Sequence, residues 1–313
     1  MNNFKELLNF LHQKQNTIEN VGLCIGKLVK IIWEKEQIDK SGSLASLRRI
    51  PEIPLKPIER IEDQICNLKK QGYKVVFDKT LRTAYRLVVG LGSSNVLETS
   101  LTLHHIFGIP YIPGTALKGV VRMVSFWEIA KDRKEGLEDL QEQLYEDDLY
   151  DSENEDIVKH KLLFGTQGFK GLLVFLDAYP EINEDQEIFE LDIMNVHYKS
   201  YYGDKGDPGD WENPNPIIFL TVKRGIPFKF YVLFDEFRAN RILENNDILE
   251  NQKGEKNQKK EILKAWIKKI LEEWIHKPDD LENLLKGWIE SALKEFGVGA
   301  KTRLGYGIFE GDL

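Results

Sequence analysis

Two basic side chains stand four residues apart in a glycine-containing motif, and this spacing suits the binding of phosphate. The motif runs from Gly108 to Arg122 (GIPYIPGTALKGVVR) and leads into an amphipathic helix that Gly114 or Thr115 is expected to cap. Free backbone amides and the dipole at a helix start attract anions, and Lys118 and Arg122 share one helical face. The motif predicts either a phosphate site that includes the Thr115 hydroxyl or an ordinary solvated helix edge.

A second basic motif lies near the end of the chain, in the glycine-rich segment Gly297 to Gly307 (GVGAKTRLGYG). It carries Lys301, Thr302 and Arg303 between glycines, which allow a backbone to approach closely. The segment follows a helix and lacks the GxxxxGK[ST] pattern, so it is not a P-loop. It predicts either a cradle for a nucleic-acid backbone or a tight turn onto an edge strand. Its glycines are Gly297, Gly299, Gly305 and Gly307.

Three further side chains invite a catalytic interpretation. Asp177 follows an apolar strand without a partner acid or histidine nearby in the sequence, which favours a turn or helix-capping role. His104 and His105 could supply the base and the acid that metal-free RNA cleavage requires. Adjacent residues on a strand point to opposite faces, so ring stacking on RNA or packing in the core is the preferred interpretation of the pair.

The composition argues against a metal site and against a uniformly basic surface. Cys24 and Cys66 lie in apolar helical patterns without histidines at ligand spacing, so we expect core fillers, no metal and no cofactor. The chain has 43 basic and 51 acidic residues, a formal net charge of −8. Long-range attraction of phosphate needs positive potential, so an RNA site would have to be a local basic groove.

The elements that would position these residues begin with helices. The first 70 or so residues have helical patterns, among them Ile58, Ile61, Ile65 and Leu68 on one face, interrupted by a proline-rich linker. No apolar run is long enough to span a bilayer and the start lacks the order of an export signal. We therefore expect a cytoplasmic protein with no membrane partner.

The remaining pattern predicts an α+β domain with a ferredoxin-like or RRM-like core. The order is strand, helix, two strands, helix, strand, as in that recurring arrangement. The expected strands are 83–89, 172–176, a hairpin of 216–222 with 228–234, and 305–309; the expected helices begin near 114, 263 and 281, and Gly297 ends the last one.

Insertions interrupt this core. We divide the chain into an N-terminal helical extension with linker (1–80) and a core (81–313), with insertions at about 132–160, 190–216 and 240–260. The first is strongly acidic and is expected to be solvated. The second is a long aromatic excursion, and its side chains offer large contact areas for a neighbouring subunit. Those side chains are Tyr198, Tyr201, Tyr202 and Trp211.

Three elements together resemble the RAMP superfamily of CRISPR-associated proteins. They are Gly108–Arg122, Leu163–Ala178 (LFGTQGFKGLLVFLDA) and Gly297–Gly307. Within the superfamily the chain is similar to the Cmr subunit-six family, over about 82–222 and 290–309. The resemblance implies a Cas7-like fold with a thumb-like insertion.

The same resemblance implies a role in antiviral defence. It implies a non-catalytic subunit of a type III-B Cmr complex that binds crRNA and target RNA beside other Cmr RAMP subunits and the small helical subunit. Thr115, Lys118 and Arg122 would contact guide phosphates, and Lys301 and Arg303 would line the same groove. The aromatic RNP motifs of RRM proteins are absent, so readout should depend on backbone and shape. The alternatives are a metal-independent endoribonuclease of the guide-processing RAMP type and a subunit that binds only protein.

Overall fold

The computed structural model describes most of the chain from Pro57 onward. Most of the helical patterns expected before Pro57, together with Cys24, lie outside the described residues. The described residues are 32–34, 37–39, 57–93, 99–131, 133, 136–145, 154–183, 186–196, 201, 203, 206–207, 213, 215–244 and 258–311.

An antiparallel sheet forms the centre of the molecule. Its strand order is β4-β8-β3-β9, and β5 also pairs with β8. Strands β3 and β8 pair from Tyr73 opposite Asp235 to Arg82 opposite Pro227. The strands are β3 (Tyr73–Thr83), β4 (Leu173–Phe175), β5 (Tyr179–Pro180), β8 (Pro227–Asp235) and β9 (Phe309–Glu310).

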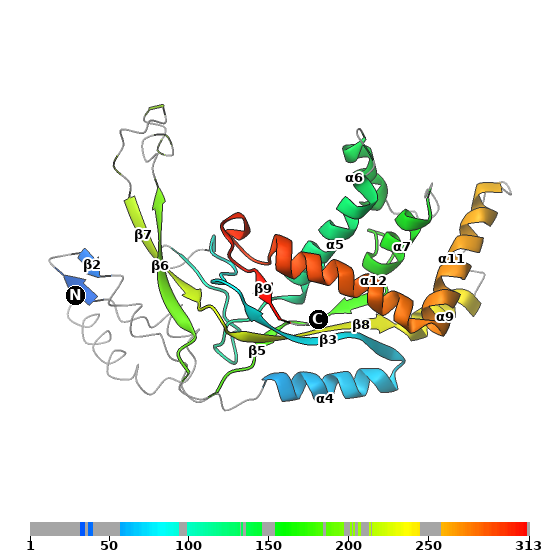
Figure 1. Cartoon of the computed structure of the whole chain (residues 1–313), viewed down its shortest axis with the longest axis horizontal. Coiled ribbons are helices and arrows are strands. Elements are labelled where there is room, and N and C mark those ends of the chain that lie inside the picture. Colours follow the sequence, from blue (N-terminus) through cyan, green and yellow to red (C-terminus); the bar gives the residue numbers. More distant parts are fainter. Residues whose placement is uncertain are drawn as a thin grey trace, which may run out of the picture.

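Helices cover both faces of this sheet (Figure 1). On one face lie α5, α7 and α12, and on the other lies α4. The helices are α4 (Pro57–Lys70), α5 (Gly114–Ala130), α6 (Leu137–Tyr145), α7 (Glu155–Phe164), α9 (Glu236–Glu244), α11 (Gln258–His276) and α12 (Pro278–Ser291), followed by the π-helix η3 (Ala292–Phe296) and the 3-10 helix η4 (Thr302–Leu304). The mixture of helix and antiparallel sheet confirms the predicted α+β class.

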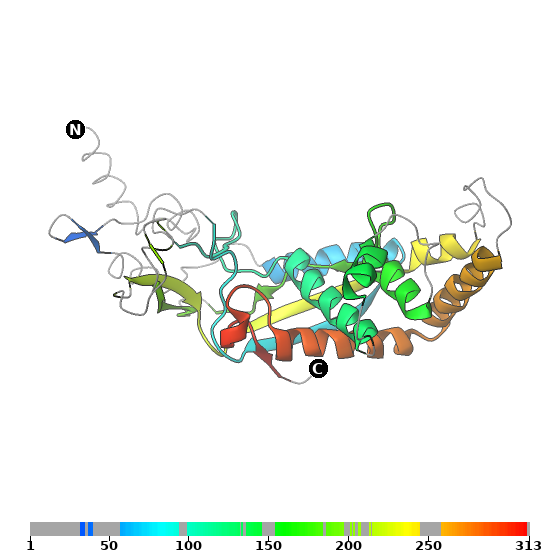
Figure 2. The ribbon, with the colours of Figure 1, turned by 90° about the horizontal axis from the view of Figure 1, so that it is seen from above.

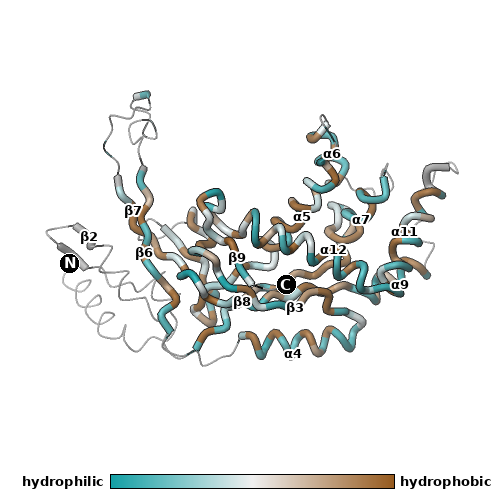
Figure 3. Tube along the Cα trace, viewed as in Figure 1, coloured by the Kyte–Doolittle hydropathy of each residue, from teal (hydrophilic) through white to brown (hydrophobic). Residues whose placement is uncertain are grey.

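The sequence explains why the sheet is covered twice. Along β8, Phe228, Phe230, Val232 and Phe234 belong to the main core beneath α5 and α12. The alternate residues Tyr231 and Leu233 face Ile65 of α4, as expected from the two-residue period of a strand. Figure 3 shows this apolar character along β3 and β8, whereas α4 alternates along its length. The predicted apolar face of α4 is therefore confirmed.

A two-stranded arm projects from one end of the sheet (Figures 1 and 2). It consists of β6 (Phe189–Val196) and β7 (Asn215–Val222), paired from Phe189 opposite Val222 to Val196 opposite Asn215. The hairpin expected between 216–222 and 228–234 is therefore wrong. Both strands exist, but β7 pairs with β6 and β8 pairs with β3, because the apolar runs specify strands without specifying their partners.

Several local expectations also need correction. Of the strand expected at 83–89, only Thr83 lies in a strand, as the last residue of β3. Beyond it, Leu87 forms an isolated bridge with Val222. The last strand is confined to Phe309–Glu310. Among residues expected to be helical, β1 (Ile32–Glu34) and β2 (Gln37–Asp39) form a short antiparallel ladder. The ends of β3 and β9 could not be predicted from local propensity, because they depend on pairing with strands far away in the sequence.

Two expectations about burial are wrong as well. The acidic insertion contains α6, whose Leu140 and Leu144 are buried beside Ala130 and Ile157. Those two leucines are four residues apart and so lie on one face of the helix. Cys66, expected in the core, is exposed on α4.

None of the helices that the structure describes combines the length and apolar character needed to cross a bilayer.

Candidate nucleic-acid interface

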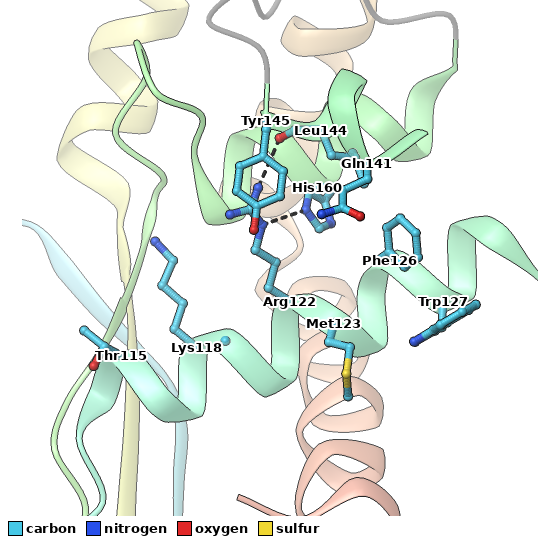
Figure 4. Close-up of a pocket in the computed structure, with 11 residues that line it drawn as sticks. Thr115, Lys118, Arg122, Met123, Phe126, Trp127, Gln141, Leu144, Tyr145 and His160 are labelled. Atoms are coloured by element: carbon cyan, nitrogen blue, oxygen red, sulfur yellow. Dashed lines mark hydrogen bonds between the residues drawn. The ribbon is translucent and has the colours of Figure 1, made fainter. Parts of the chain in front are cut away.

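Lys118 and Arg122 lie on the wall of a cavity of about 520 Å³ between α5, α6 and α7. Figure 4 shows Arg122 extending from α5 toward Tyr145 and His160, with Lys118 one turn earlier. The lining combines these cations with apolar and aromatic side chains. The lining residues are Thr115, Lys118, Gly119, Arg122, Met123, Phe126, Trp127, Gln141, Leu144, Tyr145 and His160.

The Arg122 guanidinium links three helices. Its Nε donates to Nε2 of His160 on α7 at 3.3 Å, and an Nη donates to the Leu144 carbonyl of α6 at 3.1 Å. Its central carbon lies 3.9 Å from the centre of the Tyr145 ring, a cation–π distance. Arg122 therefore has a structural role in addition to any contact with a ligand.

His160 is buried behind Arg122 and is held in one tautomer. Because Nε2 accepts the Arg122 hydrogen bond, the ring proton resides on Nδ1, which lies 3.0 Å from Oγ of Ser125. Burial, followed by the charges of Arg122 and Lys161, lowers the pKa of His160 to about 3. The neutral ring thus orients Arg122 without adding a third charge to the cavity.

Lys118 brings a second positive charge without a compensating carboxylate. Its side chain is half-buried, and burial followed by the charge of Arg122 lowers its pKa. The described lining of the cavity contains no acidic residue, and neither cation forms a salt bridge within the described part of the chain. Two adjacent cations in a partly apolar cavity favour an anionic ligand.

The start of α5 differs from the expected anion site. The residue at the N-cap is Pro113, without a side-chain cap, so the cap expected at Gly114 or Thr115 is wrong. The Gly114 amide donates to Oδ1 of Asp177 at 2.7 Å, which confirms the helix-capping role predicted for Asp177. Since a carboxylate already neutralises this helix end, phosphate would have to be held by the side chains of Thr115, Lys118 and Arg122.

The glycine-rich loop packs closely against its own chain. The Ala300 amide donates to the Val88 carbonyl at 2.8 Å, and the Gly307 amide donates to the Arg86 carbonyl at 2.8 Å. A Cβ atom at Gly299 would stand 2.5 Å from the Val88 carbonyl oxygen, and Gly299 has a φ of +102°. These glycines therefore allow the loop to pack on residues 86–88.

The basic residues of this loop stand apart from the cavity around Lys118. Lys301 has a left-handed φ of 59° and places Nζ 5.6 Å from the centre of the Phe219 ring on β7. Thr302 lies with Arg303 on η4, where Arg303 is exposed. None of the three lines the cavity, although η3, which leads into the loop, packs against α5. The structure thus shows two basic clusters on neighbouring elements.

Comparison with known proteins assigns the family. The family model described as the RAMP superfamily matches residues 80–310 of the chain. The chain belongs to the RAMP superfamily. It is 28% identical to "CRISPR system Cmr subunit Cmr6" of Pyrococcus furiosus, over 87% of this chain and 78% of that protein. It is 24% identical to "CRISPR system CMR subunit Cmr6" of Saccharolobus solfataricus, over 74% of each.

A solved structure shows the same fold. It is described as "Cryo-EM structure of the Type III-B Cmr-beta bound to cognate target RNA", and one of its chains matches with a TM-score of 0.55 and 20% identity. The match covers 99% of this RAMP protein and 85% of that chain. This likeness concerns the fold alone.

An ionic network that the sequence did not reveal joins the loop to the arm of this RAMP protein. Arg86 donates from Nε to Glu190 at 2.8 Å and from an Nη to Asp192 at 2.9 Å. The Tyr306 hydroxyl donates to the same Asp192 oxygen. Glu190 and Asp192 are two apart on β6 and therefore face one side, the signal that could have grouped them. The network fixes the base of the arm against the glycine-rich loop.

His104 and His105 occupy a turn, so the expectation that their rings point to opposite faces is wrong. Their ring centres are 4.9 Å apart and their planes differ by 23°. Both line a second cavity, of about 390 Å³, together with Asp177 and Arg60 of α4.

The structure describes one of the four aromatic residues predicted to contact another subunit. Tyr201 is 53% exposed, and Tyr198, Tyr202 and Trp211 lie outside the described residues.

In the described part of the chain no group of three His, Cys, Asp or Glu side chains is placed to hold a metal ion.

Proposed function

We propose that this RAMP protein is a non-catalytic, RNA-binding subunit of a type III-B Cmr complex in antiviral defence. It holds crRNA and target RNA beside other Cmr RAMP subunits and the small helical subunit. Its relatives carry the name of a Cmr subunit, and the solved complex with the same fold is bound to target RNA. The observation that carries the proposal is the pair of cations, Lys118 and Arg122, in a cavity whose described lining has no carboxylate.

The sheet topology supports a ferredoxin-like, Cas7-like core. In chain order the main strands are β3, β4, β8 and β9, with α5 after the first and α12 before the last. Numbered one to four, they lie in the order 2-3-1-4 across an antiparallel sheet. The arm of β6 and β7 corresponds to the thumb-like insertion. We keep the division into an extension (1–80) and a core (81–313), and its boundary falls within β3.

The face that an RRM uses for RNA is covered by α4, which supports a different mode of binding. Ile65 of α4 packs on Tyr231 and Leu233 of the sheet. RNA would therefore meet helix side chains and loops instead of an open sheet. Thr115, Lys118 and Arg122 would hold one stretch of phosphates, and Lys301, Thr302 and Arg303 another. Contacts to phosphate fix register but read no sequence, as a subunit that accepts any guide requires.

A guide-processing endoribonuclease is the second candidate, and the adjacent imidazoles favour it. An acid and a base must reach the same phosphodiester, and the stacked rings of His104 and His105 place two titratable groups side by side. Against this, Nδ1 of His104 accepts from the Ile106 and Phe107 amides, both at 3.3 Å. These bonds engage one of the two nitrogens through which His104 could exchange a proton.

Purification of the tagged full-length protein from its host tests the proposal. Mass spectrometry of the co-purifying proteins should identify the other subunits of a Cmr complex, and sequencing should find guide RNA. A matched preparation of a Lys118→Ala, Lys301→Ala variant should retain fewer guides per complex. Recovery of the protein alone, or of the complex without RNA, contradicts the proposal.

A further inference from the structure

Three rings form a continuous stack at the turn before α5. The His105 ring lies 4.9 Å from that of His104, with planes 23° apart, and the His104 ring lies 4.4 Å from that of Phe107, with planes 22° apart. Phe107 packs against the core at one end of the stack. His105 is exposed at the other end. The stack therefore presents an exposed aromatic ring on a base anchored in the core.

The middle ring is fixed in position and kept neutral. Nδ1 of His104 accepts from two backbone amides, so its proton resides on Nε2. Tyr111 and Tyr179 contact the same ring edge-on, with centres 5.5 and 5.7 Å away. Burial, followed by the charge of His105, lowers the pKa of His104. A rigid stack loses little side-chain entropy when a further ring is added to it.

The stack forms one wall of the second cavity, and α4 forms another. Arg60 and Gln64, four residues apart on α4, line this cavity of about 390 Å³ together with both histidines. Asp177 also lines it, but its carboxylate accepts the Gly114 amide at the start of α5, which offsets its charge. Within the described part of the chain, Arg60 forms no salt bridge.

We propose that His105 and His104 form a stacking platform for one unpaired RNA base, and that Arg60 binds the phosphate next to that base. This inference rests on the proposed RNA-binding function and adds to it a second, base-stacking contact. Proteins hold single-stranded RNA by stacking bases on aromatic rings, histidine included, and by cations along the backbone. The cavity offers both within one site, and the Gln64 amide can donate to and accept from a base edge.

Fluorescence of a short single-stranded RNA in which 2-aminopurine alternates with uridine tests the platform, because stacking quenches this base. The full-length protein is compared with His105→Ala, with His105→Tyr, which keeps a ring, and with His276→Ala, a matched change of an exposed histidine on α11. We expect His105→Ala to bind about tenfold more weakly and to lose the quenching, and the other two to match the wild type. Arg60→Ala should make the salt dependence of binding shallower by about 0.7.

Several results overturn the inference. The inference is contradicted if His105→Ala binds the RNA and quenches its fluorescence like the wild type, or if His105→Tyr loses binding and quenching as His105→Ala does. Loss of a co-purifying protein in His105→Ala with unchanged RNA binding would make this face a protein contact. If the wild type and its purified assembly bind no RNA, both the stacking platform and the proposed RNA-binding function are contradicted. If Lys118→Ala weakens RNA binding and His105→Ala does not, only the stacking platform is contradicted.

Discussion

Nε of Arg122 donates a hydrogen bond to Nε2 of His160, and this bond joins the helix of the proposed phosphate site to a buried ring on α7. The neighbouring Nη bond to the Leu144 carbonyl adds α6 to the same junction. Arg122 and Lys118 lie in one cavity but differ in this respect. Arg122 is held on several sides, whereas Lys118 forms no salt bridge within the described residues.

Changing Arg122 to Ala should therefore affect the stability of the fold more than changing Lys118 to Ala. Arg122→Ala is expected to lower the free energy of unfolding by about 1–3 kcal/mol, because it removes two hydrogen bonds and leaves the Leu144 carbonyl without this donor. Lys118→Ala should change the free energy of unfolding by less than about 0.5 kcal/mol, since Lys118 forms no salt bridge with a described residue. Urea unfolding measures both, with Lys131→Ala, an exposed change at the end of α5, as control. Equal stability of the Arg122 and Lys118 variants contradicts the structural role of Arg122.

His160 should make stability depend on pH. Its pKa is about 3 in the folded protein and near 6.5 when unfolded, so below about 6.5 only the unfolded chain binds the proton. The His160 contribution is complete above that pH and is lost as the pH falls toward 3, by up to about 1.4 kcal/mol per unit. His160→Gln cannot titrate and keeps an acceptor for Arg122. Its free energy of unfolding, measured by urea at pH 7 and pH 5, should fall less than that of the wild type; parallel losses contradict the assignment.

The parts of the fold that depend on local pattern could be predicted. The stripe along α5 and the end at Gly297 of the helix formed by α12 and η3 follow from neighbouring residues. The pairing of β7 with β6 could not be predicted, because apolar alternation does not name a partner strand. The link between Arg122 and α6 was hidden by the acidic composition around Leu140 and Leu144, whose helical spacing was the available signal.

Shortening the arm should prevent assembly without preventing folding. The deletion should remove residues 197–214 and join Val196 to Asn215 through an Asn-Gly turn, because those two residues already pair. It keeps Asp192, which Arg86 and Tyr306 require. The shortened protein should unfold cooperatively like the wild type but fail to co-purify with its complex, since it lacks the aromatic residues predicted to contact another subunit. Normal stoichiometry in the complex would contradict the contact role of Tyr198, Tyr201, Tyr202 and Trp211.

The isolated protein should not cleave RNA. The described residues contain no metal cluster, and the one adjacent pair of histidines has His104 engaged by two backbone amides. Labelled RNA incubated without and with divalent metal should remain intact over hours. The informative comparison is a His104→Ala, His105→Ala double variant purified in parallel. Turnover that survives stringent purification and disappears in that variant would establish the endoribonuclease instead.

The basic clusters should bind phosphate without reading sequence. We expect each of four cations to neutralise one phosphate: Lys118, Arg122, Lys301 and Arg303. Each change to Ala should therefore weaken the binding of two unrelated RNA sequences by the same factor. Each should also make the plot of log affinity against log salt shallower by about 0.7–1, because one fewer counterion is released. The measurement is a salt series of dissociation constants for wild type and single variants, with a subcomplex used if the isolated chain binds weakly.

The same series distinguishes the two clusters from an ordinary charged surface. Lys131→Ala is the matched control, because this exposed lysine follows α5 and does not line the cavity around Lys118. Its affinity and slope should equal those of the wild type. A variant that weakens the binding of one RNA sequence but not of the other would identify a residue that reads bases. If all four variants keep the wild-type affinity and slope, these cations only solvate the surface, and RNA must be held elsewhere on the chain.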